Sequence, residues 1–191
     1  MDFKLINETT RYDVLKAASP EPWKTPMNVR IQGYTVRFVR VEMDRNKNKC
    51  VAVFSTLPPP GHTDQDVYVS LEDFWEMYDE NETSSKKISL ASLLNLVIMH
   101  GSIKIYCTCP SWLYGGYKYM ATELDYAYGS YENRFPKIKN PKLLGTLCKH
   151  AYIIVKALPY QKFGIEAAIK RYLNSLPKVS DKTEVENKED K

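Results

Sequence analysis

Two short pairs of possible metal ligands constrain this chain more than any other feature. The stretch IYCTCPSW carries Cys107 and Cys109, and the stretch LCKHAY carries Cys148 and His150. The chain has only four cysteines, so three of them belong to these two pairs. A structural zinc ion takes four sulfur or nitrogen ligands in a tetrahedron, commonly supplied as two close pairs. The spacing therefore predicts one metal site made by all four side chains.

The local sequence indicates how each pair could reach one ion. An apolar, β-branched run precedes Cys107 and predicts a strand, in which side chains i and i+2 point to the same face. Cys148 and His150 cannot chelate from the middle of a helix, because residues i and i+2 point about 200° apart there. They can do so if Cys148 lies just before the first turn and His150 inside it. The LLGT stretch followed by an apolar run predicts such a helix start, which also favours a thiolate.

Other interpretations of the cysteines stay open. Cys107 and Cys109 could be two free thiols or a C-x-C redox pair, although no thioredoxin-like strand–helix pattern follows them. Cys148 and His150 could form a nucleophile–base dyad, but residues so close along a chain rarely align for proton transfer. Cys50 begins a predicted strand, and we interpret it as a small core hydrophobe.

The composition predicts a folded core. Of the 191 residues, 43% are hydrophobic and 12% are aromatic, which excludes disorder throughout. No run of about 18 apolar residues occurs, so we expect no membrane span. The N-terminal stretch lacks the basic and apolar segments of a secretory signal. The expected location is therefore cytoplasmic, where free thiols persist.

The net charge of +4 is unevenly distributed. Residues 137–172 contain eight lysines and arginines against one carboxylate, Glu166, which gives this stretch a charge of +7. Such a stretch is compatible with nucleic-acid binding through Lys137, Lys139 and Lys142. Solvated lysines on amphipathic helices would give the same count.

Hydrophobic periodicity and turn signals predict the elements of the first half of the chain. In order, they are a short helix over 9–18, one or two strands over 28–43, a polar turn over 44–49, a returning strand over 50–57, a helix over 71–80 and an apolar helix over 89–101. Thr9 or Thr10 is expected to cap the first helix. Ser70 and Asp73 resemble a capping box that opens the second helix, and Gly101 ends the third.

Two histidines outside the ligand pairs have ordinary structural interpretations. His100 lies in the last turn of the predicted helix over 89–101, where a cation suits the helix dipole. His62 lies in the PPPGHTDQD loop and is expected at the surface.

The second half is predicted to be a strand, a long connection and two helices. The strand covers SIKIYCTC, and the connection over 110–147 includes a short helix near 117–124. Apolar residues at helical spacing then predict two helices separated by Pro159. The fold class is therefore α+β, with a small N-terminal β-hairpin or sheet, middle helices, a zinc-pinned strand–loop–helix unit and a C-terminal helical pair. The expected divisions are 1–100, 101–176 and a disordered charged tail over 177–191.

The connection between the ligand pairs is unusually rich in tyrosine. Its tyrosines are Tyr114, Tyr117, Tyr119, Tyr126, Tyr128 and Tyr131. An aromatic, nearly neutral surface is typical of a protein interface, because tyrosine buries a large area at low entropic cost. Packing of these rings against the zinc unit as a local core is the alternative.

The pattern C-x-C followed by C-x-H resembles the zinc finger of the SWIM type. The resemblance covers roughly a third of the chain, about 103–158, and it implies Zn²⁺ bound by Cys107, Cys109, Cys148 and His150. The spacer is longer than the short linkers typical of that family. The stretch ENRFPKIKNPKLLGTLCKHAY, with C-x-C-P upstream, is more similar to structural proteins of tailed bacteriophages that carry a SWIM-like site.

The resemblance implies a non-enzymatic structural or assembly protein of a phage virion, present in many copies and assembled in the host cytoplasm. Zinc would fix the tyrosine-rich segment as a surface that contacts other virion proteins. The alternative is an intracellular nucleic-acid-binding SWIM-type protein that places PKIKNPK and the final helices on phosphate. An enzyme has little support, because no carboxylate pair, glycine-rich phosphate loop or Ser/His arrangement stands out.

Overall fold

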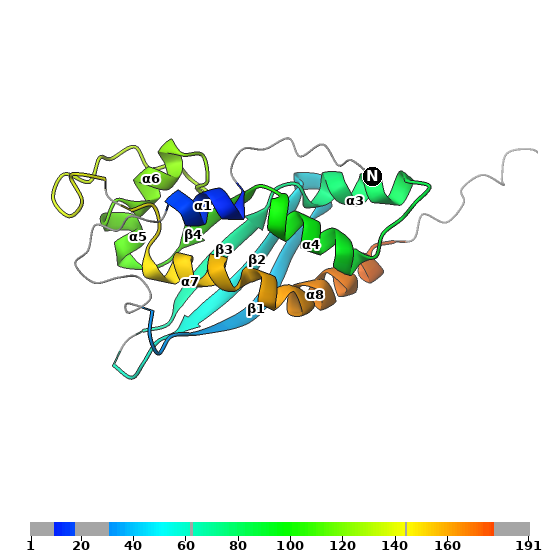
Figure 1. Cartoon of the computed structure of the whole chain (residues 1–191), viewed down its shortest axis with the longest axis horizontal. Helices are drawn as coiled ribbons and strands as arrows, with labels where there is room; N and C mark the ends of the chain where they lie inside the picture. The colour runs from blue at the N-terminus through cyan, green and yellow to red at the C-terminus, as the bar shows by residue number, and fades with distance from the viewer. Residues whose placement is uncertain (1–9, 18–30, 62, 144, 178–191) are drawn as a thin grey trace, which may run out of the picture.

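The computed structural model describes residues 10–17, 31–61, 63–143 and 145–177. Within them the chain forms an antiparallel sheet of four strands in the order β1-β2-β3-β4, with helices packed on one of its faces (Figure 1). The predicted α+β class is confirmed. The described helices include none that is long and apolar enough to cross a membrane.

Strands β1 (Thr35–Asp44) and β2 (Lys49–Leu57) form the predicted hairpin. The 3-10 turn η1 (Arg45–Lys47) joins them, and Asn48 adopts the left-handed conformation with φ of 50°. The pairing shifts between Phe38 and Arg40, which leaves Val39 as a bulge in the edge strand. Cys50 is fully buried on the face of β2 that joins the hydrophobic core, so the interpretation of Cys50 as a core residue is confirmed.

Strand β3 (Gln65–Leu71) was not predicted, and it corrects one of the helix caps. Ser70 lies inside β3 and pairs with Val51, so it caps no helix. Helix α3 (Phe74–Thr83) begins after Asp73, whose side chain makes no capping bond. The Asp73 carboxylate instead accepts a hydrogen bond of 2.7 Å from the Ser102 amide. The apparent capping box was wrong because the alternating residues of DVYVSL favour a buried strand over a helix start.

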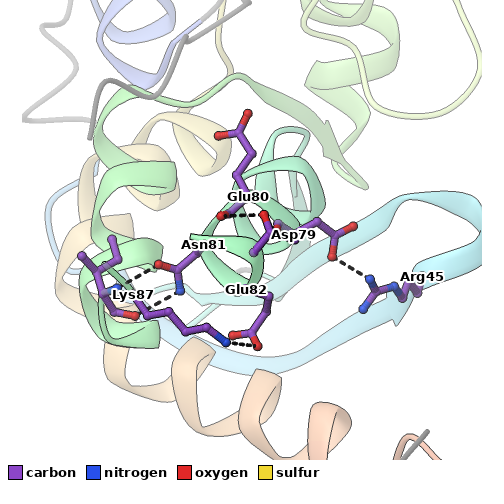
Figure 2. Close-up of polar contacts among 8 residues, drawn as sticks. Arg45, Asp79, Glu80, Asn81, Glu82 and Lys87 are labelled. Carbon is purple, nitrogen blue, oxygen red and sulfur yellow. Dashed lines mark hydrogen bonds and ion pairs between the residues drawn. The ribbon is translucent and has the colours of Figure 1, made fainter. Parts of the chain in front are cut away.

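Helix α3 leads into α4 (Leu90–His100) through a turn held by side chains (Figure 2). The Asn81 amide group both accepts from and donates to the Ile88 backbone, at 2.8 and 3.1 Å. A Lys87–Glu82 ion pair spans the same turn. As predicted, Gly101 follows the last turn of α4, and His100 lies exposed inside that turn.

Strand β4 (Ile103–Cys107) pairs with β3 and completes the sheet. Its free edge is partly covered by residues 126–128, which make a parallel bridge at Ala127 to Ile105. Two short helices follow β4, α5 (Pro110–Tyr114) and α6 (Tyr117–Glu123), of which the second was predicted. They lie at one end of the molecule, away from α3 (Figure 1).

The last part of the chain supplies most of the helical layer. Helix α7 (Lys149–Ala157), the 3-10 turn η2 (Leu158–Gln161) and α8 (Lys162–Ser175) run as one bent rod across the sheet (Figure 1). Helix α1 (Arg11–Ala17) packs beside α7, and Arg11 Nε donates to the Val155 carbonyl at 2.8 Å. One continuous core lies between the sheet and these helices.

Some predictions fall on residues that the structure does not describe. They concern the surface position of His62, the cap at Thr9 and the disorder of the tail, of which 178–191 lies outside the described residues. Thr10 is described: its hydroxyl accepts from the Asp13 amide, and the Asp13 carboxylate accepts from the Thr10 amide, so Thr10 caps α1.

Candidate metal centre

The four predicted ligands meet at one point in the structure. One donor atom from each of Cys107, Cys109, Cys148 and His150 lies within 4.8 Å of the other three. All four residues are buried, and His150 is the most exposed of them at 8%. A closed set of three sulfur atoms and one imidazole nitrogen is a donor set of structural zinc sites. The cluster could therefore hold a metal ion, with zinc favoured by its chemistry.

The first pair reaches this point by a route that differs from the prediction. Cys107 is the last residue of β4 and points into the core. The strand ends there, and Thr108 turns outward, where its hydroxyl donates to Asp66 and Gln65. Cys109 is the N-cap of α5 and not a strand residue, so the expectation that both thiols share one strand face is wrong. Pro110 at the first helical position accounts for the change, since its fixed φ starts a helix.

The second pair has the predicted geometry. Cys148 is the N-cap of α7, and His150 lies in the first turn of that helix. The Cys148 Sγ accepts a hydrogen bond of 3.4 Å from the Ala151 amide. A helix start therefore presents Cys148 and His150 toward the same point, which a mid-helix position would not allow.

The electrostatics of the cluster favour a cation. Burial raises the pKa of the Cys107 and Cys148 thiols above the ordinary value for cysteine. Hydrogen bonds from those two side chains lower the pKa of Cys109. The Cys109 Sγ also accepts from the Trp112 amide at 3.3 Å. Three thiols crowded in a dry site can lose their protons together only if a cation compensates their charge.

A buried polar atom without a partner also fits a metal. The Nδ1 atom of His150 is buried and has no hydrogen-bond partner among the described residues. Buried ring nitrogens are normally satisfied, so an orphan atom inside a ligand cluster calls for an explanation. A bound ion would supply the missing interaction at this cluster.

Residues that sequence patterns did not reveal enclose the site. The Tyr34 ring lies 5.5 Å from the His150 ring, and the Lys149 ammonium lies 4.6 Å above the Tyr34 ring. Tyr34 precedes β1 and is far from the ligands in sequence, so no local pattern could have placed it there. The Tyr126 hydroxyl, from the segment beside β4, donates to the Thr146 carbonyl just before the second ligand pair.

The six tyrosines between the ligand pairs fall into three groups by burial: two are buried, two are exposed, and Tyr119 and Tyr128 are half-buried. Tyr117 and Tyr126 are buried at 1% exposure each and belong to the core. Tyr114 and Tyr131 are exposed at 61% and 63%. The local-core interpretation is therefore confirmed for Tyr117 and Tyr126, and the interface at the exposed rings stays a prediction. Deleting the segment would remove core residues, so a test of the interface requires point substitutions.

Comparisons with protein-family models, with curated proteins and with solved structures found no match to this chain. A metal centre is therefore inferred from these four residues and their geometry.

Proposed function

We propose that this chain is a non-enzymatic zinc-binding structural protein that makes protein–protein contacts, as a virion component of a tailed bacteriophage would. The single observation that carries the proposal is the buried cluster of three thiols and one imidazole at the two ends of the segment 110–147. Zinc at that cluster would join β4 and α5 to the start of α7. All four donors are buried, which suits a structural ion better than a catalytic ion with an open coordination position.

The segment between the ligands has the composition of an interaction surface. Its exposed large apolar residues are Tyr114, Leu124, Tyr131, Phe135 and Ile138. Ile138 is 92% exposed and lies in a turn between Lys137 and Lys139. Of the exposed apolar side chains, it would have the largest exposed fraction to bury against a partner. Exposed apolar residues gathered in one short segment mark interaction sites more often than scattered ones do.

Contacts with α6 hold this surface in a fixed shape. The Glu132 amide donates to the Thr122 hydroxyl at 3.0 Å, and Lys118 Nζ donates to the Ser130 hydroxyl at 3.1 Å. The Phe135 ring packs edge-on against Tyr119 at 5.6 Å. A surface ordered before binding loses less conformational entropy when a partner binds.

Site-specific photo-crosslinking tests the proposal. A benzophenone amino acid replaces Tyr131 in one variant and Tyr12 in a control variant, because the two rings are exposed to nearly the same degree, 63% and 66%. In cells that assemble the natural complex, position 131 should give one discrete protein adduct, and position 12 should not. Adding Cys148→Ser should abolish the adduct, because the segment loses its anchor. An adduct with nucleic acid, or an adduct that survives Cys148→Ser, would contradict the proposal.

The nucleic-acid alternative rests on Lys137, Lys139 and Lys142. All three are exposed, and no ion pair involves them within the described ranges. If they contact phosphate, affinity for DNA or RNA should fall steeply with salt, and the slope should decrease when the three lysines are replaced by glutamine.

A further inference from the structure

The outer side of the rod formed by α7, η2 and α8 carries exposed aromatic rings between lysines. Lys156 lies near the end of α7, Tyr160 in η2 and Phe163 in the first turn of α8, so the three side chains come from one short stretch of the rod. Tyr160 is 82% exposed and Phe163 is 71% exposed. The opposite side of the rod holds core residues, including Leu158 and Ile165. The rod itself lies across the sheet (Figure 1).

The inner side of the rod packs closely on the sheet. At Gly164, an added Cβ would lie 3.0 Å from the Phe38 ring, so α8 lies directly against β1 at this point. Leu158, on the inner side of η2, is fully buried. The core therefore fills the inner side of the rod, and Tyr160 and Phe163 lie outside it.

The rod as a whole carries a net positive charge. Between residues 149 and 175 five lysines and arginines stand against one carboxylate, Glu166, a net charge of +4. Glu166 is already paired with Lys170 at 2.6 Å. Lys162 Nζ lies 5.4 Å from the Phe163 ring, so a cation adjoins one of the exposed aromatics. The carboxylate of Asp13, on the neighbouring helix α1, accepts a hydrogen bond from the Thr10 hydroxyl.

We propose that this face, defined by Lys156, Tyr160, Lys162 and Phe163, binds single-stranded nucleic acid. The two rings would stack on bases, and the two lysines would contact the phosphates between them. Single strands are favoured over duplexes because a duplex keeps its base faces inside the stack, where Tyr160 and Phe163 cannot reach them. The proposal is independent of the protein–protein surface at 114–138 and of zinc as the bound metal.

Fluorescence anisotropy with labelled oligonucleotides tests this site on the full-length protein. The probes are oligothymidylate of about 20 nucleotides and a duplex of equal length, titrated at rising salt from about 50 mM. The single strand should bind more tightly than the duplex. Tyr160→Ala with Phe163→Ala should weaken the binding by about tenfold or more while the circular dichroism melting temperature stays unchanged. Lys156→Gln with Lys162→Gln should flatten the salt dependence.

Two matched variants from the segment 110–147 serve as controls. Lys137→Gln with Lys139→Gln removes the same charge, and Tyr131→Ala removes a similarly exposed ring. Both should leave affinity for the single strand unchanged. The proposal would be overturned if the wild-type chain bound no oligonucleotide at low salt, or if removing the rings of Tyr160 and Phe163 left the affinity unchanged. It would also be overturned if the two control variants weakened the binding. Binding to anionic lipid vesicles but not to oligonucleotide would equally reject it.

Discussion

Cys109 and Cys148 occupy equivalent positions at the starts of two helices that are far apart in the sequence. Each Sγ accepts a hydrogen bond from the amide three residues later, at 3.3 Å from Trp112 and 3.4 Å from Ala151. Both thiols therefore lie where backbone N–H groups favour negative charge. The two helix starts converge on one point, and Cys107 and His150 complete the cluster.

Purified protein should contain about one zinc ion per chain, because two ligand pairs complete one tetrahedron. Replacing Cys109 or Cys148 with serine should remove the metal and lower the unfolding temperature of the region around α5 to α7. Elemental analysis by mass spectrometry measures the metal. Cys50→Ser is the control, because Cys50 is buried elsewhere in the core and should leave the zinc content unchanged. If protein purified under reducing conditions contained no metal, the proposed site would be refuted.

Zinc should be released as the pH falls. Thiols must lose their protons to bind zinc, so protons compete with the metal for the three cysteines and apparent zinc affinity rises with pH. A chromogenic chelator added at a series of pH values should extract zinc more readily at lower pH. In the Cys109→Ser variant no zinc should be extracted at any pH. Zinc retention that did not change with pH would argue against thiolate ligands.

Gly116 should be far less tolerant of substitution than Gly129, although both have positive φ, 81° and 88°. A Cβ at Gly116 would lie 2.6 Å from the Pro136 side chain, whereas one at Gly129 meets no atom within 4 Å. Alanine at Gly129 should cost about 1 kcal/mol of unfolding free energy from backbone strain alone. Alanine at Gly116 adds a steric clash and should cost roughly 1–3 kcal/mol more. Urea denaturation of both variants gives the difference, and equal losses would mean that Pro136 does not pack on Gly116.

The Tyr126 hydroxyl should contribute to stability. Tyr126→Phe removes the donor to the buried Thr146 carbonyl and should lower the unfolding free energy by about 0.5–1.5 kcal/mol. Tyr131→Phe removes an exposed hydroxyl and should change it by less than about 0.5 kcal/mol. Thermal denaturation of the two variants side by side is the measurement. A null effect at Tyr126 would show that water satisfies Thr146 equally well.

Among the tyrosines of the segment 110–147, replacing a buried ring should destabilise the protein far more than replacing an exposed one. Tyr117→Ala empties a core position and should cost roughly 3–5 kcal/mol, by analogy with other large aromatic truncations. Tyr114→Ala should cost little, because Tyr114 is 61% exposed. Chemical denaturation distinguishes the two. Similar losses from both would mean that Tyr114 packs against a neighbour when the protein is in solution.

Elements whose signals are local were predicted correctly from the residues alone. The polar turn at 44–49 predicted the β1–β2 hairpin, and the apolar run ended by Gly101 predicted α4. Both ligand pairs, and the helix start at Cys148, followed from residue spacing. These features depend on side chains a few residues apart, which a pattern can record.

Features that depend on contacts between distant residues could not be predicted from local patterns. β3 was missed because its short alternating run competes with an apparent helix cap, and pairing with β2 and β4 settles the choice. Tyr34 covers His150, and Tyr117 is buried while Tyr131 is exposed, although no periodicity separates these rings. Packing between segments far apart in the chain sets such positions, and the free energy of that packing is not contained in any local stretch.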